Sequence, residues 1–442
     1  MLSLTPQPAC DSLTGFVSKV CTVYHVTHLD NGLAVATAEM PHMTSVSVGI
    51  WVRVGTRFEA PKANGVCHFI EHLLFKGTSK RSAKQISEAV EGVGGYLNAF
   101  TSEEMTCFHA RASHDRLPDL LDVLTDMLLN SKFAPDDIRK ERDVIKEEIA
   151  MYLDQPQHQV QEVLNEMLWP GQPLGRPITG TPATLDGLDR AALLRHLNEN
   201  YVASATLIVA AGKVSHKQLL RRLKPYVRRF ASGPRPEAGL VADGQITPKI
   251  RLVSKKTEQT QLALAIRTCS RHDARRYPLR LLNTILGENM SSRLFQIIRE
   301  DHGLAYSIYS SPSFFEDTGD LVISAGLDTD NLEKTLRLIL RELRRLLESP
   351  PSAAELRRAR DFVLGQIALG QESTENQMNW VGEQLLGYNR IFRPADIRQQ
   401  LLAVTPADIR NVARDFFQPS RLNLALVSPL KSEKSLMRVY HL

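Results

Sequence analysis

The chain has 442 residues, of which 43% are apolar and 23% charged, so it is long enough for two or three globular domains and is neither disordered nor fibrous. The net charge of +5 comes from basic side chains spread over amphipathic segments, a pattern typical of solvated helix faces. No Gly-rich phosphate loop is present, so nucleic acid is not an expected partner.

The five cysteines form no CxxC pair, which suits a reducing compartment better than a disulfide framework. Residues 1–20 contain no continuous apolar run and no arginine, so neither a secretory signal nor a mitochondrial presequence is predicted. No uninterrupted run of about 18 apolar residues occurs, so no membrane partner is expected. We therefore expect a cytoplasmic protein in which residues 1–21 form an N-terminal extension.

Along the chain, alternating apolar residues predict strands and apolar residues at three- and four-residue steps predict helices, and this series of signals occurs twice. The segments are a strand at 46–54, helices at 116–130 and 138–150, a strand at 206–211, a strand at 262–266, helices at 331–347 and 356–368, and a strand at 422–427.

The two series indicate an internal duplication. Residues 138–150 align with residues 356–368 at an offset of 218, and Tyr201 with its following strand aligns with Phe417 at an offset of 216. Two separate matches at nearly one spacing are unlikely by chance. A segment rich in Gly and Pro separates the copies and is typical of a linker. The expected domains are 22–229 and 249–442, joined by a linker at 230–248.

Each copy opens with a strand whose apolar residues alternate, the pattern of a sheet with one face on a core. Helices and returning strands follow in both copies. The sequence therefore predicts an α+β fold of two homologous α/β-roll domains, each an antiparallel sheet covered by helices. A duplicated chain with one linker also suggests two halves that face each other as a clam-shell across a cleft.

The first copy contains the motif His68-Phe69-Ile70-Glu71-His72. On a helix, His68 and His72 project from one face and Glu71 lies beside them. Two neutral imidazoles can bind zinc while the carboxylate stays free to take a proton from water, which is the HExxH arrangement in reversed order. Because so short a motif can arise by chance, a third ligand is required to support it.

The helix at 138–150 supplies the candidates. Glu141 and Glu148 lie two turns apart and face the same way. At the corresponding positions the second copy has Ala359 and Gln366, although it keeps several flanking residues in kind. Acidic residues that occur only in the copy with the histidines behave like site residues, whereas a lone Glu would usually belong to a solvated helix face.

Five stretches carry a resemblance to a known family. They are His68–Thr78, Asn98–Glu104, Glu141–Ile145, Gln172–Arg176 and Gly303–Ser307. With these stretches the chain resembles the pitrilysin/insulysin family of inverted-motif zinc peptidases. It is most similar to the processing-peptidase-like branch of about 50 kDa, which contains bacterial relatives of the mitochondrial processing peptidase beta subunit.

The resemblance implies one Zn²⁺ per chain, held by His68, His72 and Glu148. It also implies that Glu71 is the general base on the attacking water. Glu141 corresponds to the carboxylate that orients the histidines, which is reasonable because a ligating histidine usually donates its other N–H to a carboxylate or carbonyl.

From the second half, the resemblance brings Arg299 and Tyr306 into the active site. Tyr306 would stabilise the oxyanion and Arg299 would anchor the substrate backbone. Asn98, Ala99 and Phe100 match the edge strand on which family members bind the substrate as an added β-strand. We therefore expect a zinc metalloendopeptidase that hydrolyses short or unfolded peptides in the cleft between two domains.

The alternative from a different functional class is a noncatalytic peptide-binding or core subunit of the same fold. Such subunits typically lose parts of the zinc set, whereas all four central residues are present here. The resemblance also implies a dimer, either a homodimer or a heterodimer with an inactive paralogue.

Overall fold

The computed structural model describes residues 22–440, which divide into two compact units. Unit 1 contains the described residues up to Ile149, together with Pro177–Gly239 and Ala368–Arg393. Unit 2 contains Ala150–Arg176, Leu240–Ile367 and the described residues from Pro394 onward. The N-terminal extension expected at 1–21 lies outside the described residues.

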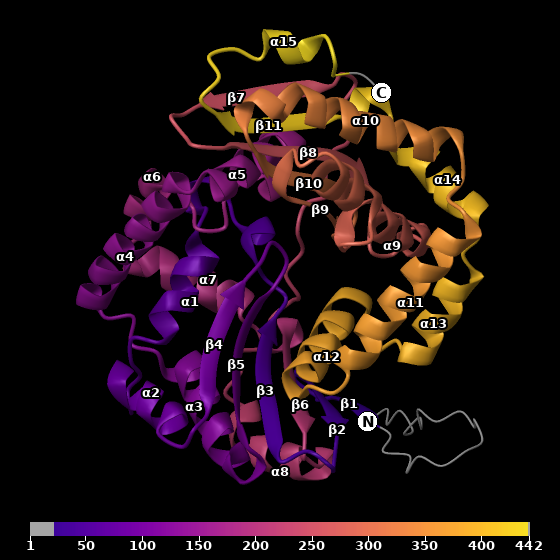
Figure 1. Ribbon diagram of the computed structural model, residues 1–442. Coiled ribbons are helices and arrows are strands. Elements are labelled where there is room, and N and C mark those ends of the chain that lie inside the picture. The colour runs from indigo at the N-terminus through magenta and orange to yellow at the C-terminus, as the bar shows by residue number, and fades with distance from the viewer. Residues whose placement is uncertain (1–21, 441–442) are drawn as a thin grey trace, which may run out of the picture. The chain divides into compact units, whose positions relative to one another are not determined.

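Unit 1 is built on a six-stranded sheet. Its strands are β1 (Val23–His28), β2 (Ala34–Glu39), β3 (Ser45–Val52), β4 (Tyr96–Thr101), β5 (Thr106–Ser113) and β6 (Thr206–Gly212), in the order β1-β2-β6-β3-β5-β4. Its main helices are α1 (Val66–Leu74), α2 (Ala83–Glu91), α3 (Leu117–Asn130), α7 (Arg190–Asn200), α8 (His216–Val227) and α12 (Thr374–Tyr388). Helices α1, α3 and α8 pack on one face of the sheet and α12 packs on the other (Figure 1).

Unit 2 is built on a five-stranded sheet. Its strands are β7 (Lys249–Ser254), β8 (Thr260–Thr268), β9 (Ala305–Phe314), β10 (Gly319–Leu327) and β11 (Asn423–Ser428), in the order β7-β11-β8-β10-β9. Its helices include α5 (Pro156–Leu168), α9 (Arg276–Asn283), α10 (Leu332–Glu348), α13 (Pro394–Ala403), α14 (Pro406–Phe416) and α15 (Lys434–Met437). Helix α5 covers one face of the sheet, and α9 and α14 lie against the other.

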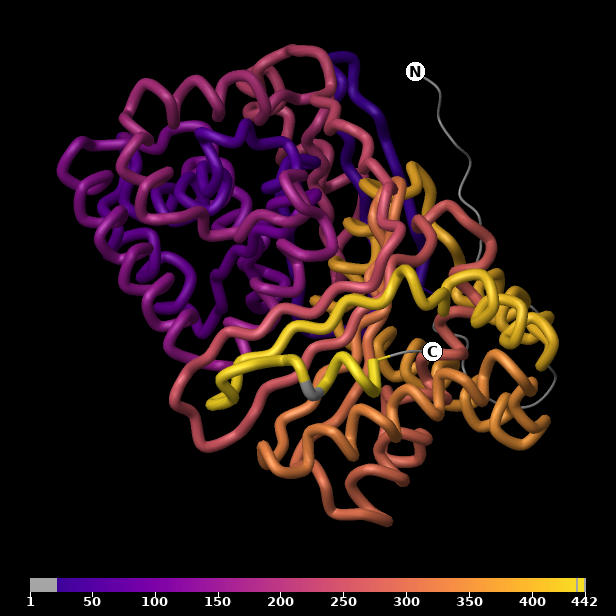
Figure 2. Tube along the Cα trace, turned by 90° about the horizontal axis from the view of Figure 1, so that it is seen from above, coloured from indigo at the N-terminus to yellow at the C-terminus, as the bar shows by residue number. Residues whose placement is uncertain are grey.

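The duplication is visible in the strand order. The order β2-β6-β3-β5-β4 of the first sheet corresponds to β7-β11-β8-β10-β9 of the second, and only β1 has no counterpart. In both sheets one pair of neighbours is parallel, β2 with β6 and β7 with β11, and all other pairs are antiparallel. Figure 2 shows the yellow strand β11 running beside the pink strands of residues 249–268. The predicted α+β class with mainly antiparallel sheets is confirmed.

The strand of the first copy whose apolar residues alternate is β3, but both of its faces are buried. Val48 and Ile50 belong to the core under α1 and α3. Ser47, Gly49 and Trp51 point to the opposite face, where α12 covers them, so the expectation of one core face is incomplete. Small residues permit this approach, because a Cβ at Gly49 would lie 2.5 Å from Met378 Sδ.

The two copies exchange one helix each. Helix α5 comes from the first half of the chain and packs on the second sheet, whereas α12 comes from the second half and packs on the first sheet. Each exchange follows a long helix, α4 (Pro135–Asp154) or α11 (Ala353–Gly370), within which the boundary between the units falls. The expected domain ranges, 22–229 and 249–442, follow the order of the chain and do not describe this exchange of helices.

Residues 231–246, in the expected linker, contain no helix or strand. Between residues 22 and 440, no helix is both long enough and apolar enough to cross a bilayer.

The close packing of α12 on the first sheet gives a stability prediction. A Cβ at Gly382 would overlap the buried ring of Trp51, so we expect Gly382→Ala to destabilise the chain by about 1–3 kcal/mol, the usual cost of overpacking. Gly365→Ala in α11 is the matched control, because a Cβ there meets no neighbour and Ala favours a helix. Thermal unfolding should show a lower melting temperature for the first variant only; equal melting temperatures would contradict the packing.

Candidate metal centre

Helix α1 carries the predicted motif and is held by its apolar side. It begins after Gly65, whose φ of 93° is one that L residues rarely adopt, and a Cβ there would lie 2.7 Å from the Thr179 carbonyl oxygen. Its apolar residues belong to the core of unit 1, namely Val66, Cys67, Phe69, Ile70, Leu73 and Leu74. Because this side is fixed by packing, the directions of His68, Glu71 and His72 are fixed as well.

The buried carboxylate of Glu59 caps the N-terminus of α1. Its Oε2 accepts hydrogen bonds from the Gly65 N–H at 2.8 Å and from Asn64 Nδ2 at 2.9 Å, and its Oε1 accepts one from the Cys67 N–H at 2.9 Å. Only 4% of Glu59 is exposed. An anion at a helix N-terminus satisfies otherwise unpaired N–H groups and interacts favourably with the helix dipole.

His68, His72 and Glu148 come together between α1 and α4. Glu148 Oε2 lies 3.8 Å from His68 Nε2 and 3.7 Å from His72 Nε2, and one donor atom from each residue lies within 4.8 Å of the others. Ligand atoms around a tetrahedral zinc ion at about 2.0–2.1 Å are about 3.3 Å apart, so the spacing is close to that of a metal site. Between residues 22 and 440, no other group of this kind is found.

These three atoms face one another at the centre of the site. Burial and, to a lesser extent, the neighbouring His72 lower the pKa of His68 to about 3, so its imidazole is neutral. The Nδ1 atom of His72 lies 3.2 Å from Glu141 Oε2 and donates to that carboxylate, which leaves Nε2 as the ring nitrogen that faces Glu148. Two imidazole nitrogens and a carboxylate oxygen that converge in this way fit a cation at their centre.

Glu141 and Lys76 support His72 from behind. Glu141 is 5% exposed, and its Oε1 lies 2.8 Å from Lys76 Nζ. Burial acts to raise the pKa of Glu141, but the hydrogen bonds from His72 and Lys76 outweigh it and hold the pKa below its ordinary value. Glu141 is therefore an ionised acceptor that keeps the His72 ring in one orientation.

Glu71 lies between the histidines in sequence and accepts a hydrogen bond at Oε2 from Thr101 Oγ1 at 2.5 Å. Burial raises the pKa of the Glu71 carboxyl above its ordinary value, and the hydrogen bond from Thr101 acts in the opposite direction. A carboxylate with a raised pKa beside a metal site has the properties of a general base.

The predicted substrate strand is β4, which is the last strand of its sheet. Asn98 is exposed, and its Oδ1 accepts a hydrogen bond from the Ala99 N–H at 2.9 Å. The Phe100 ring packs edge-on against Trp51 with 5.5 Å between the ring centres. One edge of β4 pairs with β5, and no described strand pairs with the other edge.

Arg299 and Tyr306 lie in unit 2, whereas the histidines, Glu71, Glu141 and Glu148 all lie in unit 1. Tyr306 is 78% exposed on β9, and the Arg299 guanidinium carbon lies 5.4 Å from the centre of its ring. The two residues therefore form a cation–π pair at the surface of unit 2.

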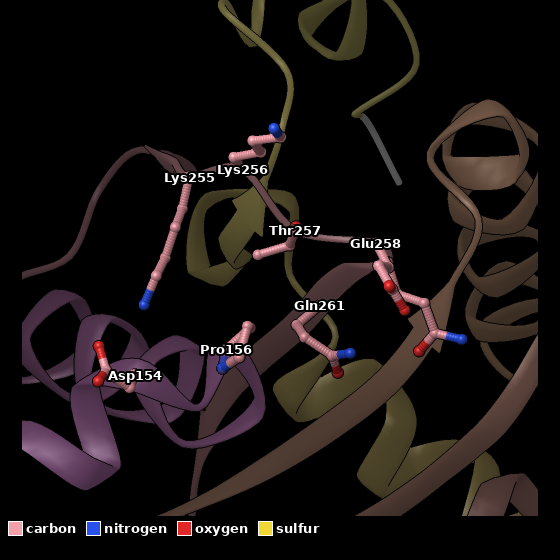
Figure 3. A pocket seen from close by; sticks show the side chains of 8 residues that line it. Asp154, Pro156, Lys255, Lys256, Thr257, Glu258 and Gln261 are labelled. Atoms are coloured by element: carbon pink, nitrogen blue, oxygen red, sulfur yellow. The ribbon is translucent and has the colours of Figure 1, made fainter.

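An open cavity of about 350 Å³ lies elsewhere in unit 2, between the α4–α5 junction and the loop joining β7 to β8 (Figure 3). Lys255 extends across it toward Asp154, and its Nζ donates to the Leu153 carbonyl oxygen at 2.7 Å. None of the predicted site residues lines this cavity.

The sequence analysis missed Glu59, Lys76 and Thr101. Lys76 follows His72 by four residues and lies just after the end of α1, within the stretch His68–Thr78, so this spacing was a usable signal. Thr101 lies within the stretch Asn98–Glu104, but its contact with Glu71 depends on tertiary packing. Glu59 has no signal of its own, because it caps α1 from outside the usual capping positions.

Comparisons with known proteins agree with the resemblance. The family model described as Insulinase (Peptidase family M16) matches residues 34–182, and the model described as Peptidase M16 inactive domain matches residues 187–363. An uncharacterized zinc protease of Streptomyces coelicolor is 37% identical over 92% of this chain and 90% of its own length. The uncharacterized zinc protease YmxG of Bacillus subtilis is 36% identical over 90% of this chain and 97% of its own.

Solved structures share the fold. A protease from Helicobacter pylori superposes with a TM-score of 0.87 at 20% identity, covering 92% of this chain and all of that one. A chain of complex III2 from Candida albicans superposes with a TM-score of 0.81 at 19% identity, covering 94% and 98% of the two chains. At 37% identity over nine-tenths of its length, with two matching family models, the chain belongs to the insulinase family of peptidases, peptidase family M16.

Proposed function

We propose that the chain is a zinc-dependent endopeptidase that hydrolyses short or unfolded peptides. The observation that carries the proposal is the convergence of one ring nitrogen each of His68 and His72 with a carboxylate oxygen of Glu148, next to Glu71. The relatives that are named zinc proteases support zinc as the cation.

His68, His72 and Glu148 would hold one Zn²⁺, and Glu141 with Lys76 would keep the His72 ring in its ligating orientation. Bound zinc supplies Lewis-acid polarisation of the scissile carbonyl and lowers the pKa of a bound water. A structural zinc site would use four protein ligands, whereas three leave a position for water, as a catalytic site requires.

Glu71 would accept a proton from the attacking water and return it to the leaving amine. Its raised pKa suits this role, because the best proton acceptor in a reaction near neutral pH has a pKa closer to that pH than an ordinary carboxylate has. Its carboxylate has one oxygen bound to Thr101 and the other available for this transfer.

The unpaired edge of β4 supports binding of the peptide as an added strand at Asn98, Ala99 and Phe100. Main-chain pairing of this kind accepts extended peptides of many sequences and excludes folded proteins. By resemblance, Arg299 would hold the peptide backbone and Tyr306 would donate to the oxyanion. The dimer and the cytoplasmic location stay predictions.

Replacement of Glu71 tests the enzymatic role directly. Glu71→Gln keeps the shape and the hydrogen bond from Thr101 but cannot take up a proton, so kcat for a fluorogenic peptide should fall by about 10²–10⁴-fold while bound zinc is unchanged. Wild-type turnover by a variant that holds zinc would remove Glu71 from the mechanism. A wild-type chain that binds peptides but binds neither zinc nor zinc-chelating inhibitors would favour the noncatalytic alternative.

The metal ligands can be tested with three neighbouring glutamates of α4. Glu148→Gln should lose most bound zinc, and Glu141→Gln should weaken zinc binding by about 10–100-fold, the usual effect of removing a residue that orients a ligand. Glu147→Gln is the control, because Glu147 is exposed on another face of the helix. Zinc affinity measured against a competing chelator should follow this order; loss of zinc in the Glu147 variant would contradict the assignment.

The role of Tyr306 can be separated from a general effect of β9. Tyr306→Phe removes only the hydroxyl, and we expect kcat to fall by about 10²–10³-fold with little change in KM, because an oxyanion donor acts mainly in the transition state. Tyr309→Phe on the same strand is the matched control, since Tyr309 is also exposed, at 51%. Equal effects of the two variants would count against the proposed donor.

A further inference from the structure

Thr101 is the last residue of β4 and the hydrogen-bond donor to the Glu71 carboxylate. The distance of 2.5 Å between Thr101 Oγ1 and Glu71 Oε2 is at the short end for a hydroxyl and a charged acceptor. Neither the internal duplication nor the family resemblance assigns this residue a role.

The alternation of β4 explains why this hydroxyl reaches α1. Leu97 and Ala99 pack against the core cluster that contains α1, so the side chain two residues further on, Thr101, lies on the same face. Phe100 belongs to the opposite face, in contact with Trp51. The register of β4 on β5, which pairs Thr101 with Thr106, therefore sets the position of the donor.

We propose that Thr101 is a positioning residue that holds Glu71 in its reactive orientation and ties this orientation to the strand on which the peptide binds. The inference rests on the proposed function and adds to it a residue that acts through Glu71.

The physical reason lies in the freedom of the glutamate side chain. Glu71 has several rotatable bonds, so its carboxylate can adopt other orientations once its donor is removed. A donor bound to Oε2 leaves Oε1 available to take up the proton. Because Thr101 belongs to the same strand as Asn98, Ala99 and Phe100, any shift of that strand moves the base together with the peptide.

The test uses the full-length zinc-loaded chain and a fluorogenic peptide. Thr101→Val keeps the β-branched shape that suits a strand but removes the hydroxyl, and we expect kcat to fall about tenfold or more with KM within twofold and zinc content unchanged. Thr101→Ser keeps the hydroxyl and should restore most of kcat. Thr106→Val is the matched control. Thr106 pairs with Thr101 across the two strands, but its hydroxyl donates to the Val54 carbonyl oxygen and not to Glu71.

A second readout does not depend on activity. In the metal-free protein, Thr101→Val should lower the melting temperature in the wild-type background and much less in a Glu71→Ala background, because the second background has already lost the acceptor. Equal shifts in the two backgrounds would show that the hydroxyl stabilises the strand without acting on Glu71.

The outcomes separate this inference from the proposed function. An active wild type with an unaffected kcat in Thr101→Val, or with no rescue by Thr101→Ser, overturns the role of Thr101 alone. A wild type that cleaves no peptide overturns the proposed function and the inference together. If Thr106→Val lowered kcat as much as Thr101→Val, the effect would belong to the packing of the β4–β5 pair and the role of Thr101 would be overturned.

Discussion

The candidate site depends on the burial of the apolar side of α1 in the core of unit 1. Phe69, Ile70 and Leu73 pack among the strand residues beneath them, so the helix cannot rotate without exposing this surface to water. Burying three such side chains is worth about 1.5–3 kcal/mol each. Because the helix is held in this way, His68 and His72 stay directed at Glu148.

Each carboxylate around this helix has its own fixed donors. Glu59 accepts N–H groups at the start of α1, Glu141 accepts His72 and Lys76, and Glu71 accepts the Thr101 hydroxyl. Removing a donor leaves a buried carboxylate with one partner fewer, which costs more than the hydrogen bond itself contributes. The three glutamates therefore differ through their partners: Glu59 caps α1, Glu141 orients His72, and Glu71 is the residue for which we propose proton transfer.

Much of the fold could be predicted because local sequence patterns determine its helices and strands. These patterns are properties of residues that are close in the sequence. They include the alternation of β3, the helical spacing of α3 and α10, the repeated segments of the duplication, and the spacing of Glu141 and Glu148 on one helix. The helix exchange could not be predicted, since nothing in residues 156–168 or 374–388 tells which of two related sheets they will cover. The contacts of Glu59 and Thr101 were missed for the same reason, whereas Arg299 and Tyr306 were assigned by resemblance and remain to be tested.

The exchange of α5 and α12 has a consequence for how such a chain can be assembled. A fragment ending at Gly239 would contain every strand of the first sheet but not α12, so Trp51, Leu207 and Val209 would face water. Neither half is thus a complete folding unit. A half-length protein of this design could be stable only as a domain-swapped dimer, in which a helix of each copy packs on the sheet of the other. When two halves are joined through one linker, the exchange of helices occurs within one chain and does not depend on protein concentration. The second copy can then lack the acidic residues of the first and still contribute α12 to the first sheet.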